Sequence, residues 1–429
     1  MESLVDGNGA EHIATHSLEF VKKRYGLKRR GKMSLAIHGG QPVRESYLAY
    51  GKQAIDNKDI AAVVEALKGD YLTTGPNVTK FEQQVAEYVG AQYAVAVSNG
   101  TAALHMAMIG CGIKSGDEVL VTPMTFAASS NAILYVGATP VFVDIDELTF
   151  NIDIKSVESK ITNKTKAIVV VDFAGQPVDL EEVLEIARKY NLMVIEDGAH
   201  ALGSEYKGHR VGALADVTTF SCHPVKPITT GEGGIATTNN SEIYERMKLF
   251  RTHGITRETS TLMDLTQGDW YYEQQTLGYN YRLTDIQAAL GSSQLDKIDR
   301  FIERRREIVA QYNEAFKEVE GLIIPYEKND RKSGYHIYVI RLRLDQVSAT
   351  RRQIYEALKA ENIGVNVHYI PVYYHPYYQA LGYERGICPI AERVYEEIIT
   401  LPLFPMMTQK DVSDVIGAVS KVIDFYRKK

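Results

Sequence analysis

The apolar residues between about positions 80 and 240 fall into short continuous runs separated by longer amphipathic stretches. Runs that are nearly continuous in valine and isoleucine are typical of strands buried on both faces of a sheet. The stretches between them, with apolar residues three and four positions apart, are typical of helices. The predicted strands cover residues 91–98, 118–123, 139–145, 166–174, 192–197, 216–221 and 233–238. The predicted helices cover residues 80–90, 101–112, 129–137 and 180–191.

This alternation predicts an α/β fold in which a mostly parallel sheet is joined by right-handed crossovers. The pattern changes past residue 240. A long charged helical stretch at 296–319 leads to an apolar run at 335–344, a second helical stretch at 348–364 and a last helix from about Thr408. Because strands are fewer here, we expect a smaller α+β domain from about residue 300, bridged to the sheet by the long helix.

The length of 429 residues supports two domains, since a single core stops growing at about 250 to 300 residues. We expect a large domain at residues 46–300 and a small C-terminal domain at residues 301–429. An N-terminal extension, residues 1–45, should be partly disordered. Met33 opens a stretch that reads like a natural start, so residues 1–32 are expected to be an extension or a misassigned start.

The formal charge of −6 is mild and offers no field that would hold a nucleic acid. A basic strip at residues 22–32 is the one exception, and it is interpreted as a solvated surface segment. The three cysteines are widely spaced, so they predict neither a disulfide framework nor a metal site. No apolar run reaches the roughly 18 residues that span a bilayer. These features predict a cytoplasmic protein without membrane, metal or nucleic-acid partners.

Polar residues that end an apolar run come first as candidates, because ligands of open parallel sheets bind beyond the carboxyl ends of the strands. In SNGT, residues 98–101, the first predicted strand gives way to a helix. Ser98 or Asn99 can cap that helix, and Gly100 permits a tight turn. Free N–H groups at a helix start bind phosphate readily. An ordinary capped helix is the alternative interpretation of the same stretch.

A second candidate is VIEDGAH, in which Asp197 ends an apolar run and His200 follows three positions later. A carboxylate at this place is shielded from water and needs a cation or N–H groups as partners. Taken alone, each of the two residues is better interpreted as a structural hydrogen-bonding group than as a catalytic one.

The third candidate is SCHPVKPITTGEGG, residues 221–234, which surrounds Lys226 with two prolines. Pro227 keeps Lys226 out of the helical region, and the φ of Pro224 is fixed, so the lysine side chain is aimed. The stretch GEGGIA matches a dinucleotide fingerprint letter by letter. That interpretation fails, because these glycines precede a strand, whereas the fingerprint follows a strand and opens a helix.

One chemistry uses all three candidates together. Pyridoxal phosphate needs a lysine that binds it covalently, an acid beside its pyridinium nitrogen and an anchor for its phosphate. The sequence therefore predicts a pyridoxal phosphate site built from Lys226, Asp197 and the segment that begins at Ser98.

Seven stretches, in this order and spacing, make the chain from about residue 46 to its end resemble the DegT/DnrJ/EryC1/StrS family of sugar aminotransferases. They are TTGPNVTKFEQ, SNGTAAL, TPMTFAASSNAI, VDFAGQPVD, VIEDGAHALGSEYKG, FSCHPVKPITTGEGG and LGYNYRLTDIQAALG. The resemblance implies the fold-type-I architecture of aspartate aminotransferase, with a large, mostly parallel seven-stranded sheet.

The resemblance also implies roles for individual residues. Lys226 matches the lysine that binds the cofactor covalently, and Asp197 matches the partner of the pyridinium nitrogen. Phe126 matches the aromatic residue that stacks on the cofactor ring, with His200 near the ring or its hydroxyl. The matches to the phosphate-binding positions are Thr101, Ala102 and Ser221.

Asn280 matches the asparagine that reaches the phosphate from a neighbouring subunit, which implies at least a homodimer with a shared site. Arg282 is the candidate anchor for the carboxylate of the amino donor, since a guanidinium fork suits it. The Tyr-rich stretch 369–378 either lines a sugar or uracil pocket, with His368 and Tyr369 as contacts, or packs the small domain. Cys222 stands where the family commonly has phenylalanine, and residues 255–276 form an acidic, Tyr-rich insertion.

The implied reaction moves an amino group from L-glutamate to C4 of a nucleotide-linked 4-keto-6-deoxysugar, by ping-pong covalent catalysis. Within the family, the amino-acid sequence is most similar to those of the aminotransferases of pseudaminic acid biosynthesis. Their substrate is UDP-2-acetamido-2,6-dideoxy-β-L-arabino-hexos-4-ulose. Another dTDP-, GDP- or UDP-linked ketosugar is the alternative. A sugar dehydratase on this fold has histidine in place of Lys226, and a non-catalytic regulatory protein is the rival of a different class.

Overall fold

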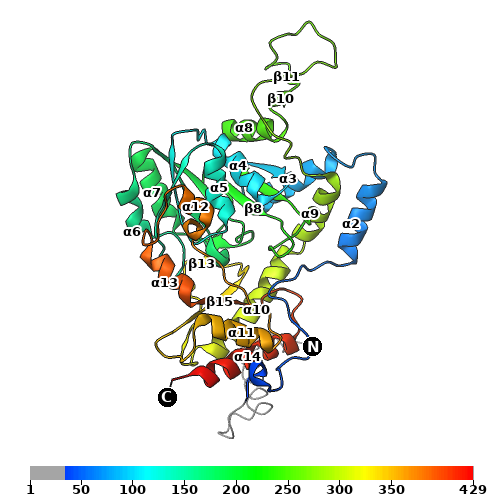
Figure 1. Ribbon diagram of the computed structural model, residues 1–429. Coiled ribbons are helices and arrows are strands. Elements are labelled where there is room, and N and C mark those ends of the chain that lie inside the picture. Colours follow the sequence, from blue (N-terminus) through cyan, green and yellow to red (C-terminus); the bar gives the residue numbers. More distant parts are fainter. Residues whose placement is uncertain (1–33, 429) are drawn as a thin grey trace.

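The computed structural model describes residues 34–428 (Figure 1). Most of the expected extension therefore lies outside the described residues. Residues 34–45 pack on the C-terminal part of the chain, where Leu35 is fully buried. The buried carboxylate of Glu361 accepts the N–H groups of Ala36 and Val43 at 2.9 Å each. Helix η1 (Ala36–His38) lies in this segment.

The predicted seven-stranded sheet is confirmed. Its strand order is β1-β9-β8-β5-β4-β2-β3, and β9 alone among the seven runs antiparallel to its neighbours. In chain order its strands are β1 (Tyr93–Val97), β2 (Glu118–Val121), β3 (Thr139–Phe142), β4 (Thr165–Val171), β5 (Met193–Asp197), β8 (Val217–Ser221) and β9 (Gly234–Thr238). Nearly all of their residues are buried, because helices cover both faces of the sheet.

The helices divide between the two faces. One face packs on α4 (Gly100–Gly110), α5 (Ala127–Tyr135) and α8 (Ser241–Arg251). The other packs on α3 (Pro76–Val89), α7 (Leu180–Tyr190), α9 (Asp285–Leu295) and the short α6 (Ile154–Val157), with η2 (Glu158–Lys160) following. Helix α2 (Asn57–Lys68) lies against α9 at the edge of the molecule, as Figure 1 shows.

The C-terminal part has its own core. Helix α10 (Ile298–Phe316) leads out of the sheet domain, as the sequence predicts, and packs on α14 (Gln409–Tyr426). The remaining elements are α11 (Arg351–Ala360) and an antiparallel sheet of β12 (Leu322–Ile323), β14 (Tyr338–Leu342) and β15 (Ile398–Leu401). No helix within residues 34–428 is long and apolar enough to cross a membrane.

Residues 369–397 form a strap that leaves this second core and packs against the first. The strap comprises η4 (Val372–Tyr374), α12 (Pro376–Ala380) and α13 (Pro389–Glu397). Val372, Tyr373 and Tyr378 are buried in the apolar cluster under α4 and α5. The Tyr378 hydroxyl donates to Asn131 Oδ1 at 2.7 Å, and Asp144 accepts two N–H groups at the start of α13. The strap therefore lies in the sequence range expected for the small domain but is buried with the large one.

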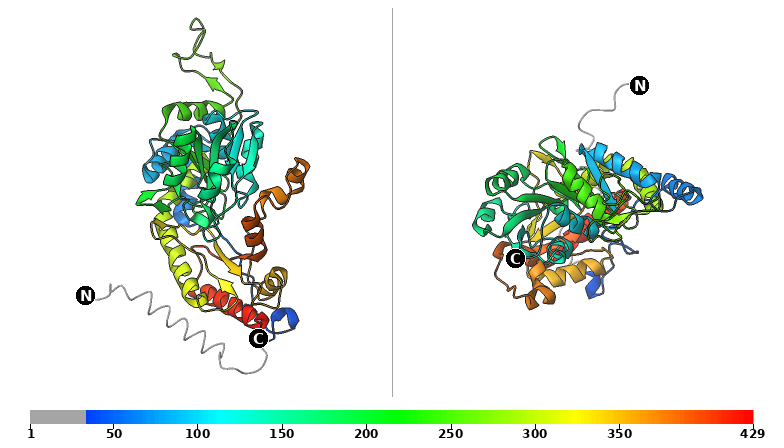
Figure 2. Two further views of the ribbon diagram at one scale, coloured as in Figure 1. Left: turned by 90° about the vertical axis from the view of Figure 1, so that its left-hand side faces the viewer. Right: turned by 90° about the horizontal axis from the view of Figure 1, so that it is seen from above.

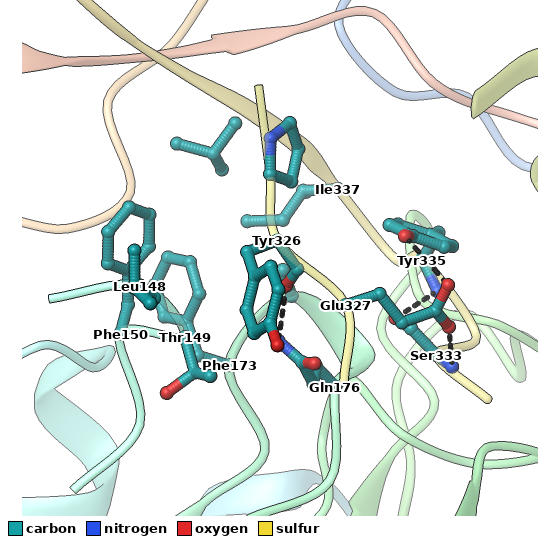
Figure 3. Close-up of a pocket in the computed structure, with 13 residues that line it drawn as sticks. Leu148, Thr149, Phe150, Phe173, Gln176, Tyr326, Glu327, Ser333, Tyr335 and Ile337 are labelled. Carbon is teal, nitrogen blue, oxygen red and sulfur yellow. Dashed lines mark hydrogen bonds between the residues drawn. The ribbon is translucent and has the colours of Figure 1, made fainter. Parts of the chain in front are cut away.

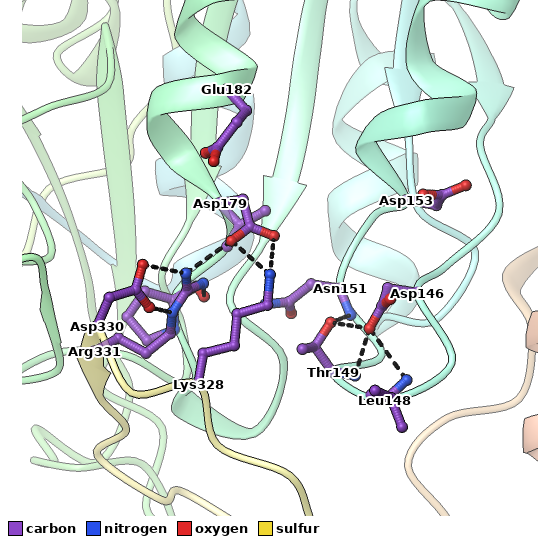
Figure 4. A network of polar contacts seen from close by, with 12 residues as sticks. Asp146, Leu148, Thr149, Asn151, Asp153, Asp179, Glu182, Lys328, Asp330 and Arg331 are labelled. Carbon is purple, nitrogen blue, oxygen red and sulfur yellow. Dashed lines mark hydrogen bonds and ion pairs between the residues drawn. The ribbon is translucent and has the colours of Figure 1, made fainter.

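A second joint between the two parts is polar (Figure 4). Asp179 accepts Lys328 Nζ at 2.7 Å and Arg331 Nη2 at 2.7 Å. Nearby, η3 (Phe173–Gly175) contributes to a small apolar pocket with Tyr326 and Ile337 (Figure 3). The room that this pocket leaves for water molecules is small, about 30 Å³.

The insertion at residues 255–276 is a hairpin that projects from the end of α8, as Figures 1 and 2 show. It is paired at its base by β10 (Ile255–Thr256) and β11 (Glu273–Gln274). Its apolar side chains are exposed, including Met263, Leu265 and Trp270. The last small sheet consists of β6 (Glu205–Tyr206), β7 (His209–Arg210) and β13 (Arg331–Lys332).

Candidate active site

Three of the predicted strand ends meet at one edge of the sheet. Strands β1, β8 and β5 run in the same direction, so Ser98, Ser221 and Asp197 lie at or next to their carboxyl ends. Two glycines allow a close approach there. A Cβ at Gly100 would lie 2.9 Å from Ser221 Cβ, and one at Gly234 would lie 2.3 Å from the Asn99 carbonyl oxygen. Ser221 therefore sits directly against the start of α4.

The start of α4 is capped by Asn99, whose Oδ1 accepts the Ala102 N–H at 2.8 Å. The structure thus bears out the capping interpretation of the SNGT stretch. It also brings Thr101 and Ala102 beside Ser221, the three residues matched to the phosphate position. The Ala102 N–H is already engaged by Asn99, so the helix dipole, Thr101 and Ser221 are the groups that remain for an anion at this place.

Asp197 ends β5 with its side chain toward the face covered by α5. Its Oδ2 accepts the Ser129 hydroxyl at 2.6 Å, and its Oδ1 accepts the Ala199 N–H at 3.1 Å. Burial raises the pKa of the Asp197 carboxyl, whereas these hydrogen bonds and the charge of Lys226 lower it. The neighbouring Glu196 points to the opposite face, because successive residues of a strand alternate.

Lys226 lies in the loop after β8 and is half-buried. Its N–H donates to the His223 carbonyl at 2.9 Å, which closes a turn before Pro227. Burial lowers the pKa of the Lys226 amine to about 8, although the carboxylate of Asp197 opposes that shift. A substantial fraction of the amine is therefore neutral and nucleophilic near physiological pH.

The histidines predicted for the site lie around this lysine. His200 Nε2 is 3.1 Å from the Tyr369 hydroxyl, and His200 Nδ1 is buried without a partner among residues 34–428. His368 Nδ1 is 2.8 Å from the Thr400 hydroxyl. Burial and the charge of Lys226 lower the pKa of His368 to about 4, and the same two causes lower that of His200. Both imidazoles are therefore neutral at pH 7.

Phe126, the predicted stacking residue, stands at the start of α5 with 64% of its surface exposed. Its ring centroid is 6.4 Å from that of Tyr369. Of the other tyrosines in the stretch 369–378, Tyr373 and Tyr378 are buried in the strap. Packing therefore accounts for these two, although they pack against the sheet domain, and Tyr369 is the member of the stretch that contacts His200.

Asn280 and Arg282 lie at the base of the hairpin. Asn280 is exposed and pairs with Thr252. Arg282 pairs through its backbone with Val97, and the Tyr281 carbonyl accepts the Ser98 N–H at 2.8 Å. The segment that carries both residues is thus tied to the carboxyl end of β1. Asn280 is exposed, and its predicted role toward a neighbouring subunit stays a prediction.

Cys222 follows Ser221 but belongs to the other face of the sheet. It is fully buried among apolar residues that include Phe81, Phe220 and Ile235. Burial raises the pKa of its thiol to about 12, so the thiol stays protonated and acts as an apolar side chain. Cys222 is therefore part of the core on this face of the sheet.

Residues 53–420 match the model of the DegT/DnrJ/EryC1/StrS aminotransferase family. The chain belongs to this family. Among curated relatives, it is 41% identical over 382 residues to the spore coat polysaccharide biosynthesis protein SpsC of Bacillus subtilis, covering 89% of this chain and 98% of that protein. It is 39% identical over 384 residues to the UDP-4-amino-4,6-dideoxy-N-acetyl-beta-L-altrosamine transaminase of Campylobacter jejuni, covering 89% and 99%. GDP-perosamine synthase of Escherichia coli is 38% identical, with coverage of 89% and 100%.

Solved structures of DegT-family aminotransferases have the same fold. PseC of Helicobacter pylori, an aminotransferase of pseudaminic acid biosynthesis, superposes with a TM-score of 0.83 at 34% identity, covering 88% of this chain and all of that one. The PLP form of a putative sugar aminotransferase from Streptococcus pneumoniae gives 0.82 at 32% identity, covering 88% and 99%. The protein is a nucleotide-sugar aminotransferase whose cofactor is pyridoxal phosphate, and a non-catalytic role is not supported.

The residues at the sheet edge fit the cofactor of a DegT-family aminotransferase. The buried, unpaired Nδ1 of His200 calls for a polar partner at this place, because an orphaned buried nitrogen costs free energy. Lys226 offers an amine of lowered pKa, Asp197 a fixed carboxylate and Phe126 an exposed ring face. These are the chemical groups that an aldehyde, a pyridinium nitrogen and an aromatic ring require.

Three residues of the site escaped the sequence-based prediction. Ser129 fixes Asp197, Thr400 holds His368, and the ring of His336 lies 4.4 Å from that of His200. A serine inside a helix and a threonine inside a strand are common, so the sequence does not show that these two hold a site residue in place. His336 did carry a signal, since it is a histidine at the second position of the apolar run 335–344.

Proposed function

We propose that this aminotransferase moves the amino group of L-glutamate to C4 of UDP-2-acetamido-2,6-dideoxy-β-L-arabino-hexos-4-ulose, in the cytoplasm. The observation that carries the reaction class is the pairing of a half-buried Lys226, of lowered pKa, with the fixed carboxylate of Asp197. The choice of sugar draws support from the names of the Campylobacter and Helicobacter relatives, which align over nearly their whole length.

The proposed roles of the residues follow from their chemistry. When bound, pyridoxal phosphate supplies an aldehyde that takes up the amino group and a ring that withdraws electrons. Lys226 would hold the cofactor covalently and, once displaced, its amine would carry the proton at the Cα of glutamate. Asp197 would keep a proton on the ring nitrogen. Thr101 and Ser221 would hold the phosphate, and Phe126 would cover one face of the ring.

The substrate contacts are proposed by the same reasoning. Arg282 would bind the carboxylate of glutamate through its guanidinium fork. His368, which the charge of Lys226 influences, and Tyr369, which that of Asp197 influences, are neutral polar groups and would contact the sugar. Because both are fixed by neighbours, at Thr400 and His200 respectively, they would present a preformed surface to it.

A panel of ketosugars tests the substrate. We expect the holoenzyme with L-glutamate to aminate the UDP-linked 4-ketosugar at least about tenfold faster, as kcat/KM, than dTDP- or GDP-linked 4-keto-6-deoxysugars, because recognition of the nucleotide separates them. Product mass and 2-oxoglutarate release are the measurements. Preference for the GDP-linked sugar would favour the alternative that the Escherichia coli relative raises, and the proposed substrate would be wrong.

We also propose that the active enzyme is a homodimer with a shared site. Three observations support it. Asn280 is exposed, the projecting hairpin exposes Met263 and Trp270, and α2 exposes an apolar stripe of Ile60, Val64 and Leu67. Exposed apolar surface on this scale is typical of a protein interface.

Asn280→Ala tests the shared site. A hydrogen bond to a charged phosphate contributes about 1.5 to 3 kcal/mol, so the dissociation constant of pyridoxal phosphate should rise roughly tenfold or more. The dimer itself should persist, since one exposed amide is a small part of an interface. Spectroscopic titration and light scattering measure the two quantities. Asn163→Ala, at an exposed loop position, is the matched control, and a fully active monomer would contradict the proposal.

A further inference from the structure

His336 packs against His200 with its ring tilted, although it comes from the other half of the chain. It precedes β14, and its ring centroid lies 4.4 Å from that of His200 with an interplanar angle of 44°. Each residue is 5% exposed. Tyr369 lies near His200 as well, with ring centroids 6.0 Å apart and planes 19° apart. The His200 imidazole is therefore packed against aromatic rings from two later segments of the chain.

The backbone of His336 is held on both sides. Its N–H donates to the Ala174 carbonyl at 2.9 Å, and its carbonyl accepts Arg305 Nη1 at 3.0 Å. Arg305 is 2% exposed and also donates to the Leu403 carbonyl at 2.8 Å. Gly175 permits this arrangement, because a Cβ there would lie 2.8 Å from the His200 carbonyl oxygen and 3.0 Å from the Tyr335 nitrogen. The backbone of His336 is thus held by the fold before any ligand binds, and its buried ring, whose Nδ1 has no partner among the described residues, is left to pack on His200.

Burial and the titratable groups around His336 keep it neutral. Those that act on it are Lys226 from the loop after β8, Arg305 from α10, His200 from the loop after β5 and His368 from the segment before the strap. None of these carries a negative charge. Burial is the largest cause of the lowered pKa of His336, and these groups add to it, so the pKa lies well below its usual value. A neutral ring can pack on neutral His200 without repulsion.

We propose that His336 is a positioning residue that fixes the plane of the His200 imidazole. The inference rests on the proposed function and on the family resemblance, which implies that His200 lies near the cofactor ring or its hydroxyl. His200 has a hydrogen bond at Nε2 alone among the described residues, and one bond leaves a ring free to tilt about it. Packing against His336 removes that freedom, so the unpaired Nδ1 keeps one direction toward the cofactor.

Three variants separate positioning from simple core packing. His336→Ala removes the ring, and His336→Phe keeps an aromatic ring of similar width. Ile340→Ala deletes a fully buried side chain on β14, the strand that follows His336, in the other core. The ¹⁵N–¹H spectrum of the imidazoles, recorded against pH on cofactor-free protein, reports the tautomer and pKa of His200 directly. His200→Gln identifies its signals.

We expect His336→Ala to shift the His200 signals and to raise the pKa of His200, because water then reaches the ring. In the holoenzyme, kcat should fall about tenfold with the KM for glutamate within twofold, since a tilted group loses alignment rather than binding. His336→Phe should restore both quantities to within threefold of the wild type. Ile340→Ala should lower the melting temperature and leave the His200 signals in place.

Unchanged His200 signals in His336→Ala would overturn the proposal, as would a His336→Phe variant that behaves like His336→Ala. The same shift in Ile340→Ala would also overturn it, because general loosening would then explain the effect. Lys226→Ala distinguishes this failure from failure of the proposed function. If Lys226→Ala is inactive while His200 is insensitive to residue 336, the positioning role alone is wrong.

Discussion

Replacing Lys226 with alanine should lower the rate of transamination by about four orders of magnitude, which is the upper range for loss of a general acid–base group. The variant loses both the amine that binds the cofactor and the amine that carries the Cα proton. Intact mass after borohydride reduction should show the wild type heavier by one cofactor and the variant unmodified. Lys166→Ala, an exposed lysine on β4, should match the wild type in both measurements.

The Lys226→Ala variant should fold normally, so that misfolding would not explain its loss of activity. Burial lowers the pKa of the amine to about 8 from the 10.5 of an ordinary lysine, so the folded state disfavours its charge at pH 7. Removing the amine removes this unfavourable contribution to the free energy of folding. In the cofactor-free wild type this destabilising contribution decreases as the pH rises from about 8 to 10.5, because the folded chain binds fewer protons there than the unfolded chain. A variant that kept the cofactor adduct and full turnover would refute the assignment.

The second large effect is expected at Asp197. Asp197→Asn has the same shape and can keep the contacts with Ser129 and Ala199, so the fold and cofactor binding should change little. Its amide carries no charge to stabilise a protonated ring nitrogen, and electron withdrawal by the ring weakens. We expect kcat to fall about 100- to 1,000-fold, in line with the loss of one preorganised electrostatic group. Single-turnover reaction with glutamate, followed by the absorption of the cofactor, measures this step.

Glu196→Gln is the matched control for Asp197→Asn. Glu196 is the neighbouring buried carboxyl on the same strand, but it points to the opposite face and accepts the Thr218 hydroxyl at 2.7 Å. Burial raises its pKa to about 7, so its charge is already partial at neutral pH. The control should therefore keep the single-turnover rate within about threefold. Equal losses in the two variants would show that Asp197 acts through stability and not at the ring nitrogen.

The sheet was predictable because each of its strands carries its own signal. Val169, Ile195 and Val217 sit in runs that local composition alone assigns to buried strands, and Asp197 and Ser221 could be placed at one edge because parallel strands share their carboxyl ends. The family resemblance then gave roles to residues such as Phe126 that no local pattern distinguishes. Those roles stay predictions until the variants are measured.

The parts that could not be predicted depend on contacts between distant segments. Tyr373 and Tyr378 lie among other tyrosines in the sequence, and nothing local shows that they enter the core under α5. Ser129 meets Asp197 across 68 positions, and His336 meets His200 from the far half of the chain. Such pairs arise from how the helices and the strap are arranged on the sheet, which short-range periodicity does not encode.

The strap has a consequence for how family members can exchange parts. A C-terminal piece cut at about residue 300 would take the strap with it, and Val372, Tyr373, Tyr378 and Val394 would lose the core that buries them. A chimera made at that boundary would join a strap from one parent to the surface of α5 from another. The strap and the helices beneath it should therefore come from the same parent. A chimera that takes the rest of the small domain from another parent needs crossover points at both ends of residues 369–397, so that the strap stays with the sheet domain.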